Sequence, residues 1–231
     1  MSTILAIETS SDLASAALLC GNSVIARESA GVLTHSHAIL PMVQGLLAEA
    51  GMSLRECDAV AFGCGPGSFT GVRTACGIAQ GLAFGLALPV VPVVTLLAMA
   101  HACRAVSGAS DVLAILDARM GEVYWAQYRY VDGWQEVIAP TLSPPAAVTP
   151  QGQVTACGNG VAAYAADFAH TVFAADAQST ILPRAEQVAL LARVAFAHGL
   201  ALHARDAQPL YLRNKVALTT IERQAHTKVA A

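Results

Sequence analysis

Hydrophobic and polar positions along this chain follow one order twice. A short hydrophobic run ends at an acid, Glu8, and two alternating segments follow, separated by a turn at Gly21. Further along, another hydrophobic run ends at Asp117 and is again followed by two alternating segments, with a turn at Gly133. Alternation is typical of half-buried strands, and glycine-containing two-residue turns are typical of hairpins. We therefore predict two three-stranded meanders, in which Glu8 corresponds to Asp117 and Gly21 to Gly133.

Each predicted meander is followed by segments of helical periodicity and by further short strands. The predicted strands cover residues 4–7, 13–20, 23–28, 58–62, 90–94, 112–116, 123–130, 134–138 and 154–157. The predicted helices cover residues 36–50, 69–86, 95–105, 161–168 and 184–198, and prolines 140, 144, 145 and 150 predict a loop. Meanders joined to helix–strand units indicate a duplicated α/β architecture with mixed sheets.

This plan resembles that of the actin, hexokinase and Hsp70 superfamily, a ribonuclease-H-like fold whose two lobes close over a nucleotide. The resemblance implies an actin-like two-lobe fold for this chain. Residues 107–110, Ser-Gly-Ala-Ser, form the best linker in the sequence. We therefore expect an N-terminal lobe over residues 1–106 and a C-terminal lobe over residues 107–231.

Composition and charge exclude several classes of protein. Of the 231 residues, 55% are hydrophobic and 13% are charged, which excludes a disordered chain. The net charge is −3, so the chain has no basic domain for binding nucleic acid by itself. Six scattered cysteines without a CxxC pair indicate buried free thiols in a reducing compartment. The first residues lack the basic segment of a secretory signal, and we expect a cytoplasmic protein.

An uncharged stretch from residue 74 to residue 103 contains the repeat Gly77, Gly81 and Gly85. In a membrane this repeat would form a helix-dimerisation face. Prolines interrupt the stretch after residue 88, however, and leave fewer than the roughly 20 residues that a spanning helix needs. We therefore predict a buried helix of a soluble protein and not a membrane span. Its glycines indicate the close approach of another helix, which belongs either to the same lobe or to a partner.

The glycine-rich loop at residues 63–71 follows a predicted strand and opens a predicted helix, as anion-binding loops do. It is not a Walker A loop, because Val72 and Arg73 stand where lysine and serine or threonine are required. It is not the dinucleotide fingerprint either, because Thr70 replaces the last glycine. Two interpretations remain, an anion site and a tight structural turn, and the lack of a phosphate-reading residue favours the turn.

Glu8 and Asp117 stand where ATPases of the superfamily carry the acids that arrange magnesium and phosphate. Gly158 and Gly160, which precede a predicted helix, complete the candidates for a nucleotide site. The glycine that usually follows the first acid is missing, because residues 8–11 read Glu-Thr-Ser-Ser. We therefore expect no cofactor and no independent ATP hydrolysis. We also predict neither a metal site at His35-Ser36-His37 nor a serine-hydrolase triad.

Five segments closely resemble the TsaB family, also known as YeaZ. They are ILAIETS at residues 4–10, HSHAILP at 35–41, GPGSFTGVR at 65–73, DARMGEVY at 117–124 and PLYLR at 209–213. The resemblance runs from residue 3 to about residue 216. It implies a bacterial protein needed to make N6-threonylcarbamoyladenosine beside the anticodon of tRNAs that read codons starting with A. In the modification that the resemblance implies, TsaC makes threonylcarbamoyl-AMP. TsaD then transfers the threonylcarbamoyl group to tRNA together with TsaB and the ATPase TsaE.

The resemblance implies a non-catalytic scaffold, because TsaB is similar to TsaD but lacks its metal-binding histidines. We expect a heterodimer with TsaD, contacts with TsaE and also TsaC, and tRNA binding only through the complex. A homodimer of the free protein stays open. The alternative function is an enzyme, either a weak nucleotide hydrolase or a peptidase acting on TsaD. The expected partner interface comprises Leu40, Val43, Leu47, Thr74, Gly77, Ile78, Gly81 and Gly85.

Overall fold

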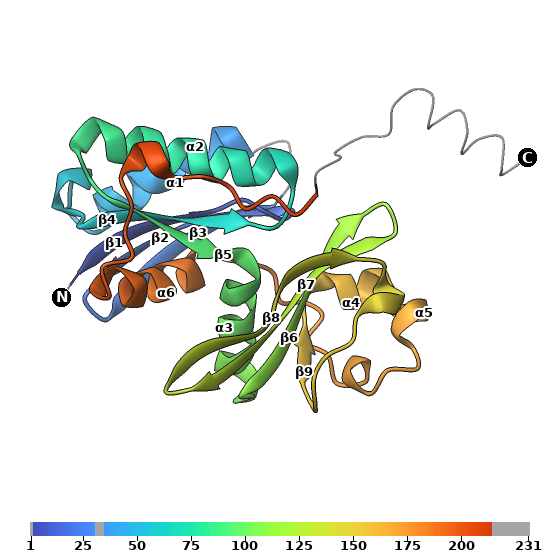
Figure 1. The fold of residues 1–231 in the computed structure, drawn as a ribbon. Helices are drawn as coiled ribbons and strands as arrows, with labels where there is room; N and C mark the ends of the chain where they lie inside the picture. The colour runs from blue at the N-terminus through green and yellow to red at the C-terminus, as the bar shows by residue number, and fades with distance from the viewer. Residues whose placement is uncertain (1, 31–34, 214–231) are drawn as a thin grey trace, which may run out of the picture.

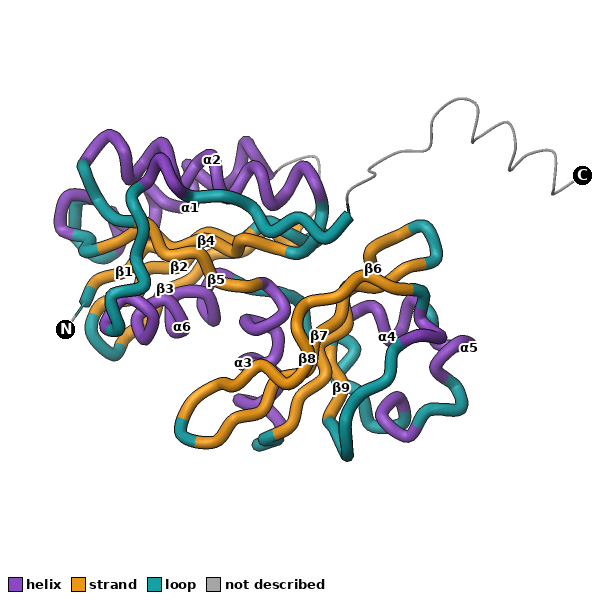
Figure 2. Tube along the Cα trace, in the orientation of Figure 1, coloured by secondary structure: helices purple, strands orange, loops and turns teal. Residues whose placement is uncertain are grey.

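The computed structural model describes residues 2–30 and 35–213, which form two mixed sheets flanked by helices (Figures 1 and 2). The first sheet has the order β3-β2-β1-β4-β5, from β1 (Thr3–Glu8), β2 (Leu13–Cys20), β3 (Ser23–Ala30), β4 (Ala59–Gly65) and β5 (Val90–Val94). The second has the order β8-β7-β6-β9, from β6 (Asp111–Arg119), β7 (Glu122–Val131), β8 (Gly133–Ser143) and β9 (Thr155–Cys157).

The two sheets repeat one topology. In the first, β1 pairs antiparallel with β2 and β2 with β3, while β4 lies parallel to β1. In the second, β6, β7 and β8 form the same antiparallel meander, and β9 lies parallel to β6. The register places Glu8 opposite Ser15 and Asp117 opposite Val123, at the equivalent ends of β1 and β6. The predicted duplicated two-lobe fold is confirmed.

Three helices cover the first sheet, because side chains of β1 alternate between its two faces. Leu5 and Ile7 face α1 (His35–Glu49) and α2 (Phe69–Leu86), which share one face of the sheet. Ile4 and Ala6 face α6 (Ala185–Ala197) on the other side. Figure 1 shows α1 and α2 together above the sheet and α6 below it. The buried side of α2 therefore points to the sheet, while its opposite side faces outward.

The second sheet is covered by α3 (Thr95–Ser107) on one face and by α4 (Asn159–Ala163) and α5 (Ala165–Phe168) on the other. The prediction of one helix over residues 161–168 is wrong, because Tyr164 leaves the helical conformation, with φ −122° and ψ 39°. The prediction of a loop at Pro140 is also wrong. Strand β8 continues through Pro140, and an edge strand tolerates a proline there.

Two helices, α3 and α6, pack on a different sheet from the one that the predicted two-part division of the chain would give them. Helix α3 lies almost entirely before the predicted boundary between residues 106 and 107, yet most of its buried side chains pack on the second sheet. Helix α6 follows that boundary, yet it packs on the first sheet. The boundary separates the strands of the two sheets but not the helices that cover them. None of the helices in the described ranges is long and apolar enough to cross a membrane.

Candidate functional site

A cavity of about 320 Å³ lies between the two lobes. The first lobe lines it with the β1–β2 turn and with the start of α2, and the second lobe with the end of β6 and with Asn159. Residues 210–213 close it from a third side. The full lining is Ser10, Ser11, Asp12, Gly67, Ser68, Phe69, Val72, Leu116, Asp117, Ala118, Arg119, Tyr124, Asn159, Leu210, Tyr211, Leu212 and Arg213.

The β1–β2 turn packs directly against the glycine-rich loop at residues 63–71. A Cβ on Gly71 would collide with the backbone carbonyl of Thr9, and one on Gly67 would collide with Ser10. The Thr9 hydroxyl donates to the Gly71 carbonyl at 2.6 Å, and the Ser68 amide donates to the Ser10 carbonyl at 2.7 Å. The glycines therefore permit close contact with the β1–β2 turn. This geometry supports the structural-turn interpretation over the anion site.

Glu8 lies behind this loop and is absent from the lining of the cavity. It is fully buried, and a Cβ on Gly63 would collide with its carboxyl group. The carboxyl oxygens accept hydrogen bonds from the Ser10 amide at 2.6 Å and from the Thr95 hydroxyl at 3.3 Å. Burial raises the pKa of Glu8 because the charged form loses its hydration. The candidate residue Glu8 therefore lies outside the lining of the cavity.

Replacing Glu8 with glutamine is expected to stabilise the protein more at pH 8 than at pH 5. The raised pKa means that protonated Glu8 favours folding most below the usual carboxyl pKa of 4.5, and this contribution is lost as pH rises through the folded-state pKa. Glutamine carries no charge at either pH, so the difference between variant and wild type grows with pH. Urea unfolding at both pH values measures it.

Glu8→Ala serves as the control, since it leaves the Ser10 amide without its acceptor. Compared with Glu8→Gln, it should lower the free energy of unfolding by about 1–3 kcal/mol at both pH values, because neither variant carries a charge at this position. An equal effect of Glu8→Gln at pH 5 and pH 8 would contradict a raised pKa for Glu8.

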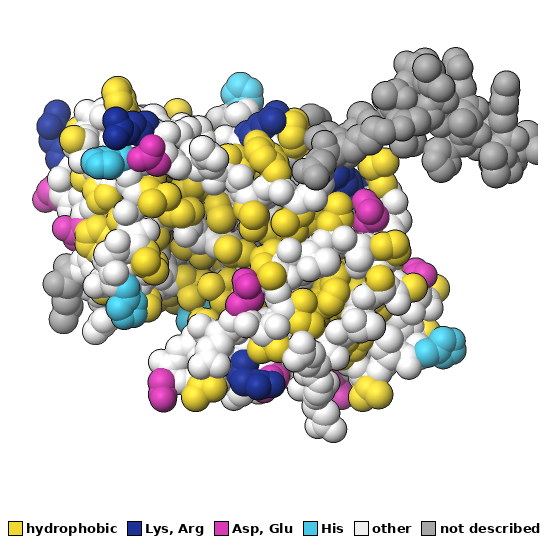
Figure 3. All heavy atoms as spheres, viewed as in Figure 1, with side chains coloured by type: hydrophobic (Ala, Val, Ile, Leu, Met, Phe, Trp, Pro, Cys, Tyr) yellow, Lys and Arg dark blue, Asp and Glu magenta, His cyan; other side chains and the backbone are white. Residues whose placement is uncertain are grey.

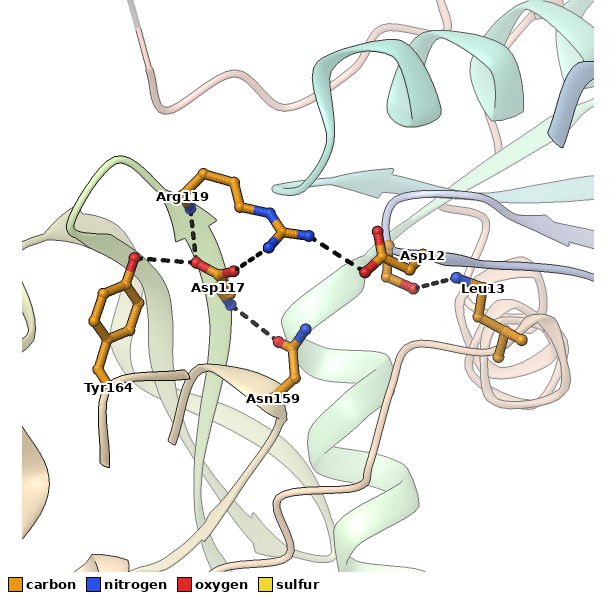
Figure 4. Close-up of polar contacts among 7 residues, drawn as sticks. Asp12, Leu13, Asp117, Arg119, Asn159 and Tyr164 are labelled. Carbon is orange, nitrogen blue, oxygen red and sulfur yellow. Dashed lines mark hydrogen bonds and ion pairs between the residues drawn. The ribbon is translucent and has the colours of Figure 1, made fainter. Parts of the chain in front are cut away.

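Asp117, unlike Glu8, lines the cavity (Figure 4). Its carboxylate accepts hydrogen bonds from the Arg119 amide at 2.8 Å and from the Tyr164 hydroxyl at 3.1 Å. The Arg119 guanidinium pairs with it at 3.0 Å. The Asp117 amide donates to the Asn159 side chain at 3.0 Å. Asp117 is therefore neutralised by a neighbouring arginine of its own hairpin.

Arg119 also joins the two lobes. Besides Asp117, its guanidinium contacts Asp12 of the first lobe at 3.3 Å, as Figure 4 shows. A register shift in β6 between Asp117 and Arg119 marks a bulge, and bulges redirect side chains near functional clefts. Arg213, which also lines the cavity, pairs with Glu122 of β7 at 2.6 Å. Each charged side chain of the cavity lining is thus held in an ion pair.

Gly158 and Gly160 do not line the cavity. A Cβ on Gly158 would collide with the Ile115 carbonyl, and one on Gly160 would lie 2.7 Å from the Ile115 Cγ2 atom. These two candidate glycines let α4 approach β6 closely.

The remaining chemical candidates are separate from the cavity. His35 is buried while His37 is exposed. Within residues 2–30 and 35–213, no group of three or more histidine, cysteine, aspartate or glutamate side chains is placed to hold a metal ion. All six cysteines are free thiols, and five of them are buried.

The functional geometry depends on residues that the sequence analysis did not select. Arg119, Asp12, Asn159 and Arg213 build the polar lining of the cavity. Arg119 and Arg213 lie inside the DARMGEVY and PLYLR segments, which was the available signal for them. Their pairing with Asp12 and Glu122 links positions about a hundred residues apart, and periodicity carries no information on such pairs.

The predicted interface residues divide by exposure. Leu40, Gly77, Gly81 and Gly85 are exposed, while Leu47, Thr74 and Ile78 are half-buried. Val43 is only 2% exposed and packs in the core, so it does not fit the predicted surface. Phe84, which was not predicted, is 78% exposed beside the glycines.

The glycine repeat of α2 is open to solvent. A Cβ on Gly77, Gly81 or Gly85 would meet no atom within 4 Å. Within the described part of the chain no other helix uses this close approach, so the glycines are available to a partner. Figure 3 shows a molecular face with many hydrophobic side chains and with lysines and arginines at a few separate places.

Comparison with known proteins gives consistent results. The family model described as "TsaD: tRNA N6-adenosine threonylcarbamoyltransferase" matches residues 27–220. The "tRNA threonylcarbamoyladenosine biosynthesis protein TsaB" of Escherichia coli (strain K12) is 39% identical over 93% of this chain and 96% of its own length. The Haemophilus influenzae protein of the same name is 38% identical over 93% of this chain and 94% of its own length. The solved structure "YeaZ from Pseudomonas aeruginosa" is 37% identical, with a TM-score of 0.85 over 92% of this chain and 100% of that one.

Proposed function

The chain belongs to the TsaB family of tRNA threonylcarbamoyladenosine biosynthesis proteins, and from this membership we propose that it acts as the non-catalytic scaffold of the modification complex. In this proposal it binds a TsaD-family protein, organises it together with TsaE, with TsaC as a further partner, and meets tRNA only inside the complex in the cytoplasm. The observation that carries the proposal is the exposed glycine repeat of α2, which has no neighbour in the described chain.

The state of the two superfamily acids supports a role without chemistry. The carboxyl group of Glu8 is buried against Gly63, and the carboxylate of Asp117 forms an ion pair with Arg119. A general acid or base must lie within hydrogen-bond reach of the substrate proton that it transfers. Glu8 lacks access to the cavity, and the Asp117 carboxylate already accepts from its own hairpin and from Tyr164.

The similarity to the TsaD family model supports a heterodimer. A partner built on the same plan would carry its own pair of helices at the positions of α1 and α2. Two such pairs packed about a pseudo-two-fold axis would bury the exposed sides of all four helices. Glycines at the helix contact would let the backbones approach closely.

The proposal predicts that the chain works stoichiometrically. In a reconstituted modification assay with a fixed amount of the TsaD-family protein, product formation should rise with added chain and level off at a one-to-one ratio. A scaffold contributes only while it is bound, whereas an enzyme acting on TsaD turns over. Radiolabelled threonine incorporation into tRNA measures the titration.

The alternatives give different curves. A peptidase acting on TsaD would restore full product at a small fraction of one equivalent and would leave shortened TsaD on a gel. A nucleotide hydrolase would consume ATP without the other proteins. Either result would contradict the scaffold.

A further inference from the structure

The outward side of α2 begins with an arginine held in one orientation. The Arg73 guanidinium carbon lies 3.5 Å from the centre of the Phe69 ring, and its Nε atom donates to the Tyr211 hydroxyl at 2.7 Å. Tyr211 is itself fixed, because the neighbouring Leu210 amide donates to the Cys64 carbonyl at 2.7 Å. Arg73 precedes Gly77 by one helical turn and therefore shares its face of α2.

In this orientation the two Nη atoms of Arg73, which could bind a carboxylate, have no partner in the described part of the chain. Arg73 is exposed, and within residues 2–30 and 35–213 neither of its Nη atoms has a hydrogen-bond partner and no carboxylate lies within 4.0 Å. An arginine whose side chain is already ordered loses less conformational entropy when it binds a carboxylate. Arginine and tyrosine are enriched among the residues that dominate binding at protein interfaces.

A second copy of the chain is poorly suited to meet Arg73 through these helices. Helix α2 contains no aspartate or glutamate. Helix α1 contains one acid, Glu49, which pairs with Arg27 at 3.0 Å. A homodimer through α1 and α2 would therefore bury Arg73 without a free carboxylate on either helix, and desolvating an unpaired charge is unfavourable.

We infer that Arg73 selects the partner at this surface by binding a carboxylate of the TsaD-family protein, and that the same residue disfavours pairing with a second copy. This inference rests on the proposed function, because it assigns a specificity residue to the proposed interface. Phe69 and Tyr211 are positioning residues that act through Arg73. The fork of the guanidinium suits two parallel hydrogen bonds to one carboxylate.

The test compares the affinity of full-length variants for the TsaD-family protein at several salt concentrations. Arg73→Gln should weaken binding about 10- to 100-fold, the effect of losing a hydrogen bond to a charged group, and should flatten the salt dependence. Arg73→Lys should recover only part of the affinity, because an ammonium lacks the fork. Tyr211→Phe keeps the ring but frees Nε and should weaken binding by a few-fold.

Arg55→Gln is the matched control. It removes the same charge from an exposed position of the first lobe outside α1 and α2, and should leave affinity within two-fold of wild type. Sedimentation of each chain alone gives the second readout, in which Arg73→Gln should self-associate at least as strongly as wild type.

Unchanged affinity and salt dependence for Arg73→Gln, together with weak binding by Gly81→Leu, would overturn the inference and leave the proposed function standing. If neither variant changed the affinity, the proposed interface itself would be contradicted. A loss confined to tRNA retention by the assembled complex would also overturn it, since Arg73 would then contact phosphate rather than carboxylate.

Discussion

Replacing Gly71 with alanine is expected to lower the free energy of unfolding by about 3 kcal/mol, the upper part of the usual range for overpacking. The added Cβ would collide with the Thr9 carbonyl, which is backbone rather than a movable side chain. The hydrogen bond from the Thr9 hydroxyl to the Gly71 carbonyl would be lost with any shift. For a chain of this size the melting temperature should fall by about 6–12 °C, measured by circular dichroism.

Gly77→Ala is the control, because it lies on the same helix with open space around it. Alanine favours a helix over glycine by up to about 1 kcal/mol, so this variant should melt at or slightly above the wild-type temperature. Equal melting of Gly71→Ala and wild type would show that the β1–β2 turn does not fill the glycine-rich loop.

Replacing Gly81 with leucine is expected to weaken binding to the TsaD-family protein about 5- to 150-fold while the chain alone melts close to wild type. The position is open in the isolated chain, so the new side chain meets no neighbour there. At a close helix contact the same group overpacks the interface by about 1–3 kcal/mol, and 1.4 kcal/mol corresponds to tenfold in affinity. Calorimetric titration measures the affinity and thermal unfolding measures the stability.

Ala197→Leu is the control, because it adds bulk at an exposed position of α6, on the opposite side of the first sheet. It should leave the affinity unchanged. Normal binding by Gly81→Leu would place the partner surface elsewhere, and a large loss of stability would mean that α2 packs differently.

Much of the fold could be predicted from local pattern. The helix over residues 69–86 and the strand over residues 90–94 have the predicted bounds, because their ends carry strong turn signals. The break at Tyr164 could not be predicted, because it accompanies a hydrogen bond to Asp117 in a distant strand. The sequence also does not predict on which sheet α3 and α6 pack, because amphipathicity shows that one face of a helix is covered but not by which sheet.

The environments of the two acids, Glu8 and Asp117, could not be predicted from local pattern either. Glu8 and Asp117 were correctly matched as equivalent ends of two strands. Their environments differ, however, because Gly63 lies against one acid and Arg119 neutralises the other. These partners are set by tertiary packing, so equal sequence positions did not imply equal roles.

We propose that this chain contributes a surface and not a catalytic group to the modification complex. This claim is tested most directly by comparing two variants in the reconstituted modification assay, the double variant Glu8→Gln with Asp117→Asn and the single variant Gly81→Leu. The double variant should keep activity within a few-fold of wild type, while Gly81→Leu should lose at least tenfold when the TsaD-family protein is dilute. A loss of 10²–10⁴ by the double variant, the usual effect of removing a general acid or base, with the heterodimer still formed, would contradict the claim.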